Sequence, residues 1–244
     1  MMNDLSLNDR SLAILAYHKI GAPPPGGWES WYYIPAETFA SHLSYLRDNG
    51  WEVIDVAAFL QGLTESKKLP DRAVLLTFDD GCCSIRDDAL RCLHRFGYPA
   101  VLFVPTDYIG GRNDFDLGAE PEEAICDWGD LRALERQGVS IQSHTASHRA
   151  FSTLNPSEQA EELRRSKEIL EAGLNNSVEI ISYPFGDAGT NPAALDEALR
   201  RTGYRAACLY KGGPIRLPVS DPYRLTRVAM GPDTDLHAEL IGRT

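Results

Sequence analysis

Long apolar runs and clusters of positive charge are both missing from this chain of 244 residues. No segment approaches the roughly 20 apolar residues that a transmembrane helix needs, so we expect no membrane span. The formal net charge is −11, with 24 Lys and Arg against 35 Asp and Glu. Because phosphate contacts need clustered Lys and Arg, this balance argues against a nucleic-acid partner. It leaves a neutral or cationic sugar open as a substrate.

Cysteine is also scarce, and its spacing is uninformative. The five cysteines are odd in number and form no C-x-x-C pair, which argues against a disulfide framework. Cys82 and Cys83 are adjacent, and we interpret them as small, semi-buried apolar residues, with sulfur ligation as the alternative. Residues 1–10 have neither an apolar core nor a basic lead, so they do not resemble a secretory signal. Together these features predict a cytoplasmic protein of undetermined oligomeric state.

Apolar runs alternate along the chain with segments of helical periodicity, which indicates βαβ units around a parallel sheet. No repeat, low-complexity tract or linker interrupts the pattern, so we predict one domain over residues 1–244. Seven or eight such units fit an α/β barrel, whose chemistry lies on the loops after the strands. Strands are expected at 12–16, 51–54, 75–78, 100–104, 139–142, 178–183, 205–208 and 225–229, and helices at 35–48, 56–63, 84–96, 129–137, 155–172, 191–201 and 236–241.

Two polar clusters follow predicted strands. Asp79 and Asp80 come directly after an apolar strand, where adjacent carboxylates are costly to place without a cation or a substrate. His144 and His148 follow a second strand. Asp80 and the two imidazoles make an O,N,N ligand set that leaves positions open for water and substrate, as in catalytic zinc sites. Asp79 then remains free to accept a proton.

Each cluster alone also has a plainer explanation. Asp-Gly sequences favour turns, so Asp80 and Gly81 fit an ordinary turn. The histidines are equally compatible with ordinary loop residues. Residues 106–127 lack periodicity, and a loop of this length is more often functional than accidental.

The two clusters resemble the motifs of a known family. Thr77-Phe78-Asp79-Asp80-Gly81 is similar to the first motif of the polysaccharide deacetylases, and Ser143-His144-Thr145-Ala146-Ser147-His148 is similar to the second. The resemblance implies a distorted, often seven-stranded β/α barrel that removes acetyl groups from sugars with a divalent metal. It implies Asp79 as the base and Asp80, His144 and His148 as the metal ligands. Zinc suits these ligands best, while cobalt, nickel, iron and manganese also fit.

The sequence departs from the family pattern in two places. The third motif often begins with an arginine that orients the base, but here Tyr183 stands in its place, as in a branch that acts on bacterial exopolysaccharide. A phenol cannot form the bidentate pair that arginine offers a carboxylate, so another residue must orient Asp79 or its orientation is lost. Residues 224–230 also lack the late histidine that serves many members as general acid. The acid is then His18, a metal-bound water, the protonated Asp79, or none.

Three residues are candidates for substrate binding. His18 follows the first strand in a Tyr-His pair that resembles the same branch, although a lone histidine is often structural. Trp128 offers an aromatic face for a pyranose, with packing in the core as the alternative. Tyr183 stands at the end of a predicted strand, where it could contact the substrate; with Pro184 after it, the same position also fits a strand end followed by a turn.

These expectations describe a metal-dependent carbohydrate deacetylase, a hydrolase of non-peptide carbon–nitrogen bonds. Water attacks the acetamido carbonyl on the metal, Asp79 takes the proton, and an amine and acetate are released. One alternative is a weakly active or inactive barrel that only binds glycans. Others are a deformylase or amidase with the same metal site, and an enzyme that uses Cys82 or Cys83 instead.

Overall fold

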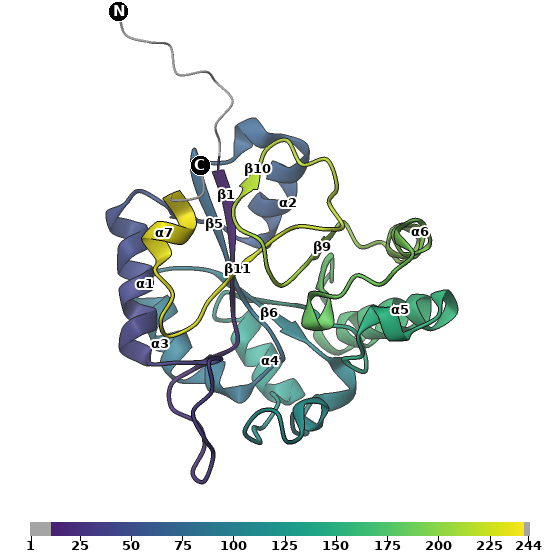
Figure 1. The fold of residues 1–244 in the computed structure, drawn as a ribbon, viewed down its shortest axis with the longest axis horizontal. Helices are drawn as coiled ribbons and strands as arrows, with labels where there is room; N and C mark the ends of the chain where they lie inside the picture. Colours follow the sequence, from purple (N-terminus) through teal and green to yellow (C-terminus); the bar gives the residue numbers. More distant parts are fainter. Residues whose placement is uncertain (1–10, 242–244) are drawn as a thin grey trace, which may run out of the picture.

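The computed structural model describes residues 11–241, which form a twisted sheet surrounded by helices (Figure 1). Six parallel strands make its centre in the order β1-β5-β6-β7-β8-β9. They are β1 (Ser11–Tyr17), β5 (Arg72–Phe78), β6 (Ala100–Val104), β7 (Val139–Ser143), β8 (Ile180–Ser182) and β9 (Ala206–Cys208). The predicted α/β class and the barrel-like parallel sheet are thereby confirmed.

Short strands complete the sheet at its margins. β4 (Glu52–Val53) pairs with β5, and β11 (Val228–Ala229) pairs with β1, both in parallel. β10 (Ile215–Arg216) pairs with β1 antiparallel, and β2 (Lys19–Ile20) forms a separate ribbon with β3 (Tyr33–Ile34). Residues 225–229 span the gap between the two edges, because Leu225 bridges to Cys208 while Val228 pairs with Leu15. The barrel is therefore closed by a strap rather than by a full strand.

Seven helices cover the outside of the sheet within the described part of the chain (Figure 1). They are α1 (Ala36–Asp48), α2 (Val56–Thr64), α3 (Asp88–Phe96), α4 (Trp128–Glu135), α5 (Pro156–Leu174), α6 (Pro192–Thr202) and α7 (Leu236–Ile241). The local sequence explains where α5 and α6 begin. Asn155 accepts hydrogen bonds from the first turn of α5, with Glu158 completing a capping box, and Asn191 caps α6 ahead of Pro192.

The central strands are buried on both faces, as a parallel sheet between helices requires. In β1, Ala13, Leu15 and Tyr17 belong to the core beneath the helices. Leu12 and Ile14 point to the other face and pack inside the barrel with Leu75 and Phe103, among others. This alternation follows from the two-residue period of a strand.

Several predicted boundaries shift. The helix expected at 84–96 is a 3₁₀ turn (Cys83–Arg86) followed by α3, and the strands expected at 178–183 and 225–229 shrink to β8 and β11. The predicted strands do not include the ribbon of β2 and β3 or the antiparallel β10. No helix within residues 11–241 combines the length and apolarity of a membrane span. The expectation about a secretory signal concerns residues 1–10, outside the described range.

Candidate active site

The two aspartates lie where β5 ends and the chain turns sharply. The amide of Asp79 still donates to the carbonyl of Tyr17, 2.9 Å away, and so continues the strand. Asp80 and Gly81 both have a φ of 71°, in the left-handed region that non-glycine residues avoid. A Cβ on Gly81 would lie 3.2 Å from Val104. The Asp-Gly turn is therefore real, and it aims both buried carboxylates inward.

Both histidines lie on the loop after β7. The Nε2 atoms of His144 and His148 lie 3.4 and 3.3 Å from Oδ1 of Asp80. The candidate ligand atoms of these three buried residues all lie within 4.8 Å of one another. Parallel strands end at one rim, so residues remote in sequence meet there.

A carboxylate from α5 holds this loop in place. Glu162 accepts hydrogen bonds from the amides of Ala146 and Ser147, at 2.9 and 2.8 Å, and from the hydroxyl of Ser147 at 2.7 Å. His148 has a φ of 56°, and its amide donates to Thr145 Oγ1 at 3.2 Å. The strained backbone at His148 is thus fixed by bonds within the loop and to α5.

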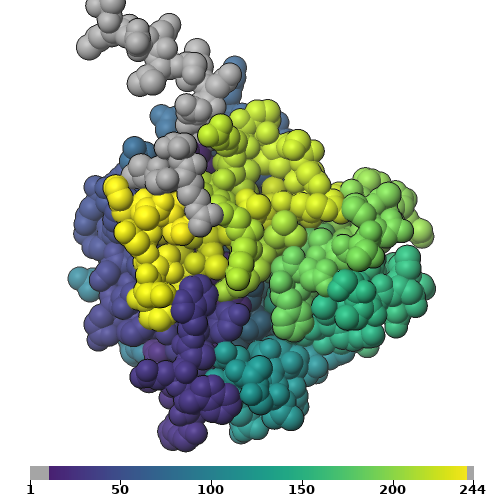
Figure 2. All heavy atoms as spheres, viewed as in Figure 1, coloured from purple at the N-terminus to yellow at the C-terminus, as the bar shows by residue number. Residues whose placement is uncertain are grey.

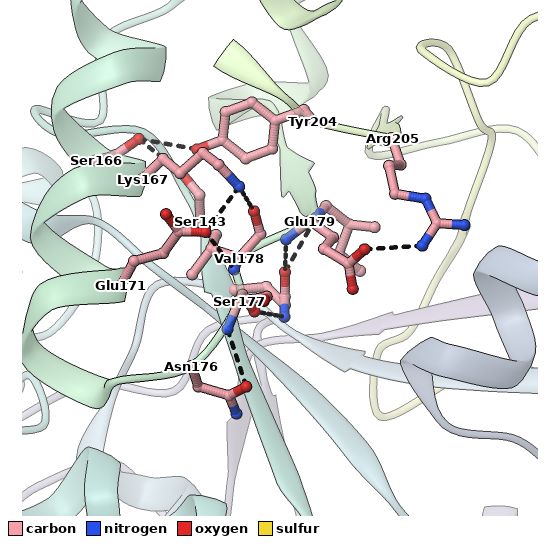
Figure 3. A network of polar contacts seen from close by, with 12 residues as sticks. Ser143, Ser166, Lys167, Glu171, Asn176, Ser177, Val178, Glu179, Tyr204 and Arg205 are labelled. Atoms are coloured by element: carbon pink, nitrogen blue, oxygen red, sulfur yellow. Dashed lines mark hydrogen bonds and ion pairs between the residues drawn. The ribbon is translucent and has the colours of Figure 1, made fainter.

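Behind the loop, hydroxyl groups tie β7 to α5 (Figure 3). Ser143 accepts a hydrogen bond from the amide of Thr145 and donates one to Ser166 on α5. Ser166 lies 3.2 Å from the hydroxyl of Tyr204. Lys167 on the same helix donates to the carbonyl of Val178, just before β8. These bonds fix the end of the strand that precedes His144.

The hydrogen bonds of the imidazoles fit a cation at this point. His144 Nδ1 donates to the carbonyl of Ser182 at 2.7 Å, which turns Nε2 toward Asp80. Burial lowers the pKa of His144, but the hydrogen bond to Asp80 outweighs burial and the net shift is upward. Burial lowers the pKa of His148, which favours the neutral ring that can bind a metal. Burial also opposes ionisation of Asp80, but hydrogen bonds from both histidines hold its pKa well below the usual value. One carboxylate and two imidazoles suit zinc and similar ions.

Arg227, which sequence analysis did not single out, pairs with the other aspartate. Its Nη1 and Nη2 donate to the two carboxylate oxygens of Asp79 at 2.8 and 2.7 Å. Further bonds run from the guanidinium to Thr77, Ser182 and the carbonyl of Leu209. Burial raises the pKa of Asp79, but the Arg227 charge outweighs it and the net shift is downward. Asp79 is therefore ionised at neutral pH.

Tyr183 does not take the place of the missing motif arginine. Its hydroxyl donates to the carbonyl of Tyr223 at 3.1 Å, and its ring packs edge-on against Phe151. Tyr183 is fully buried and contributes to the wall of the cavity beside the aspartates. The orienting arginine comes instead from the closing strap of residues 225–229. The one signal in the sequence is Arg227 itself, a charged residue within the strand predicted at 225–229, because a buried charge needs a partner.

A cavity of about 290 Å³ opens in front of these residues. Tyr32, Tyr210 and the exposed Phe185 form aromatic walls, while Asp116 and Glu120 bring acidic groups from the loop 106–127. Glu120 pairs with the buried Lys19 at 3.0 Å. Figure 2 shows the dark purple residues after β2 beside the teal loop on this face, where Ser30 donates to Glu120.

Two predicted substrate contacts have different outcomes. His18 lines the cavity, with its ring centre 4.5 Å from that of Tyr32, and its Nδ1 has no hydrogen-bond partner among the described residues. Trp128 lies outside the cavity, between α4 and α5, where a Cβ on Gly173 would come within 2.1 Å of its ring. The packing alternative therefore describes Trp128, because the first turn of α4 faces α5 and not the strand ends.

Sequence analysis also missed residues that surround the histidines. Phe115 and Phe185 pack near the His148 ring, with centres 4.1 and 4.9 Å away. Asp116 faces the ligand group, and burial, followed by the charge of Asp80, raises the pKa of Asp116 to about 7. The length of loop 106–127 indicates a function, but no pattern within it identifies Phe115 or Asp116, and Phe185 lies in the turn after β8.

Comparison with known proteins agrees with the fold and the motifs. Residues 66–207, more than half of the chain, match the family model of polysaccharide deacetylase. The chain belongs to the polysaccharide deacetylase family.

Relatives and solved structures span most of the chain. YxkH of Bacillus subtilis (strain 168), described as a candidate polysaccharide deacetylase, is 29% identical over 91% of this chain and 72% of its own length. A poly-β-1,6-N-acetyl-D-glucosamine N-deacetylase of Staphylococcus epidermidis is 22% identical over 83% of this chain and 69% of its own.

Two solved structures share the fold. The deacetylase PplD of Streptococcus pyogenes, in complex with acetate, has a TM-score of 0.77 at 22% identity over 91% of this chain and 93% of its own. IcaB of Ammonifex degensii has a TM-score of 0.77 at 24% identity over 93% and 94%.

Proposed function

We propose that this member of the family is a metal-dependent hydrolase that removes the acetyl group from an N-acetylated sugar or glycan. The observation that carries the proposal is the convergence of Asp80, His144 and His148 beside an arginine-bound Asp79. A divalent metal held by these three residues would polarise the acetamido carbonyl and acidify water. Zinc is the ion we expect.

Asp79 is the proposed base. Its ionised carboxylate accepts the proton of the attacking water, and Arg227 keeps both oxygens in one orientation during the transfer. Because each carboxylate oxygen carries two lone pairs, the arginine bonds leave acceptor capacity for the water. Arg227 is thus a positioning residue that acts through Asp79.

His18 is the proposed donor to the departing amine. It lies in the same cavity, and its Nδ1 has no partner among the described residues. Burial lowers the pKa of His18 although Asp80 and Asp79 oppose that shift, so the neutral ring must take up a proton from solvent before it donates one to the amine. Proton return from Asp79 remains the alternative route. Tyr183, which shares the cavity wall, stays a proposed substrate contact through its backbone and ring edge.

The substrate is proposed from the cavity and from the relatives' names. Aromatic walls formed by Tyr32, Tyr210 and Phe185 suit the apolar faces of pyranose rings. The named activity of the Staphylococcus epidermidis relative makes β-1,6-linked N-acetylglucosamine oligomers the first substrates to test.

The test measures bound metal and released acetate on a panel of N-acetylated saccharides. Asp80→Ala is expected to lose the metal, whereas Asp79→Asn keeps it and loses about 10²–10⁴-fold in kcat, the usual contribution of a general base. Asp48→Asn, an exposed aspartate on α1, is the matched control with wild-type values.

Three results would contradict the proposal. Wild-type rates in both site variants, on every sugar that the wild type accepts, would exclude the mechanism. Sugar binding without acetate release would indicate a glycan-binding barrel. Faster turnover of N-formyl substrates or other amides would indicate a deformylase or amidase instead.

A further inference from the structure

A second group of potential metal ligands lies outside the cavity. It consists of Cys83 at the start of the 3₁₀ turn after β5, Cys126 at the end of loop 106–127, and Asp130 in the first turn of α4. The two sulfurs and a carboxylate oxygen all lie within 4.8 Å of one another. Cys126 is buried, and the other two residues are half-buried.

The backbone explains why the two thiols meet. Cys82 and Ile125 form an antiparallel bridge. The amide of Cys83 donates to Ala124 and that of Cys126 to Gly81, each at 2.9 Å. In such a ladder Cys83 and Cys126 are diagonal neighbours on one face, while Cys82 points to the other. Although Cys82 and Cys83 are adjacent in the sequence, only Cys83 therefore faces Cys126.

The carboxylate of Asp130 accepts hydrogen bonds from neighbouring groups, as ligating carboxylates do in metal sites. Oδ1 of Asp130 accepts a hydrogen bond from Arg86 at 2.8 Å, and Oδ2 accepts one from the amide of Asp127 at 3.1 Å. Two thiolates and a carboxylate carry three negative charges, which a divalent cation and the guanidinium of Arg86 together neutralise. Arg86 thus balances the charge of an occupied site.

The thiols also differ in how readily they ionise. A hydrogen bond with Cys126 lowers the pKa of Cys83, burial opposes this, and the charge of Arg86 lowers it further. The same hydrogen bond, together with burial, raises the pKa of Cys126. Cys83 is therefore the thiol that first supplies a thiolate, the form that binds metals.

We propose that Cys83, Cys126 and Asp130 form a second metal site, for a thiophilic divalent cation such as Zn²⁺. Thiolate and carboxylate are both zinc ligands, and water can fill the fourth position. The cation would fasten the end of loop 106–127 to the turn that follows Asp79 and Asp80. The site is structural and does not depend on the proposed deacetylase activity.

Cadmium titration of the reduced, chelator-treated full chain tests this site. Thiolate-to-cadmium charge-transfer absorption in the ultraviolet reports sulfur ligation, which the site of Asp80 and the two histidines cannot produce. We expect a stoichiometric signal in the wild type and in Asp80→Ala, competed away by Zn²⁺. The signal should vanish in Cys83→Ser. Arg86→Gln should weaken cadmium binding about tenfold, as loss of an outer-shell partner does.

Cys92→Ser is the matched control, because Cys92 is half-buried on α3 and belongs to no ligand group within residues 11–241. It should leave the cadmium signal unchanged. The proposal is overturned if the wild type, with all five thiols reduced by intact mass, gives no charge-transfer signal. It is also overturned if the signal survives in Cys83→Ser. Failure of zinc to displace cadmium, or a disulfide between Cys83 and Cys126 in place of metal binding, overturns it as well.

Discussion

Replacing Arg227 with methionine should leave Asp79 as a buried charge without a counter-charge. The side chains of Arg227 and Asp79 are 0% and 3% exposed, and two charged hydrogen bonds of 2.8 and 2.7 Å join them. Methionine fills much of the same volume, so the loss is mainly electrostatic. Removal of one partner from a buried pair costs about 3–5 kcal/mol, and we expect this loss in the free energy of unfolding.

The loss should depend on pH, with a sign that follows from the pKa of Asp79. In the wild type this pKa lies below that of the unfolded chain, about 3.9. The pair's contribution is therefore present above that pH and is lost as the pH falls through the lower, folded pKa. In Arg227→Met only burial remains as a major influence, so the pKa rises above the unfolded value. The variant should then recover stability relative to wild type between about pH 7 and pH 4.

Urea unfolding of the metal-free proteins, followed by circular dichroism across this pH range, measures the difference. Arg227→Lys keeps the charge but not the bidentate geometry and should lose less stability. Arg224→Met is the matched control, since Arg224 pairs with Asp196 and Asp221 nearer the surface and should cost about 1 kcal/mol or less. A loss in Arg227→Met that equals the control's, or that does not vary with pH, would refute this account of Asp79.

Three further outcomes follow from the site. Trp128→Ala should cost about 2 kcal/mol in thermal unfolding, less than a fully buried tryptophan, and leave kcat unchanged, because Trp128 packs on Gly173. Tyr183→Phe should cost about 1 kcal/mol through its lost bond to Tyr223, again with kcat retained. Asp116 has a pKa raised to about 7, so metal-free protein should lose stability as the pH rises from about 4 through 7. Asp116→Asn should flatten that slope in urea midpoints.

The parts of the fold that could be predicted are those with a local pattern. The predicted strand at 100–104 and the helix at 236–241 coincide with β6 and α7, because their apolar spacing and flanking residues are unambiguous. The meeting of Asp80 with His144 and His148 also followed from local facts. Asp80 and His144 lie within two residues of the end of a parallel strand, His148 lies on the same loop as His144, and parallel strands end at one rim.

Contacts between distant segments could not be predicted in this way. Arg227 lies beside a two-residue strand, and its partner Asp79 is 148 positions away. Glu162 lies in a helix rich in charged residues, where nothing in the sequence distinguishes it from its neighbours. The tyrosine of the third motif illustrates a related limit, because motif position identifies the backbone site of Tyr183 but not the direction of its side chain.

The strap of residues 225–229 supplies Arg227, which holds both carboxylate oxygens of Asp79. The family match stops at residue 207, before Arg227 is reached. The three proposed metal ligands are complete at residue 148, some 80 residues before Arg227, whose guanidinium pairs with Asp79. The proposed hydrolysis therefore depends on the pairing of this strap with β9 and β1, because that pairing places Arg227 against Asp79.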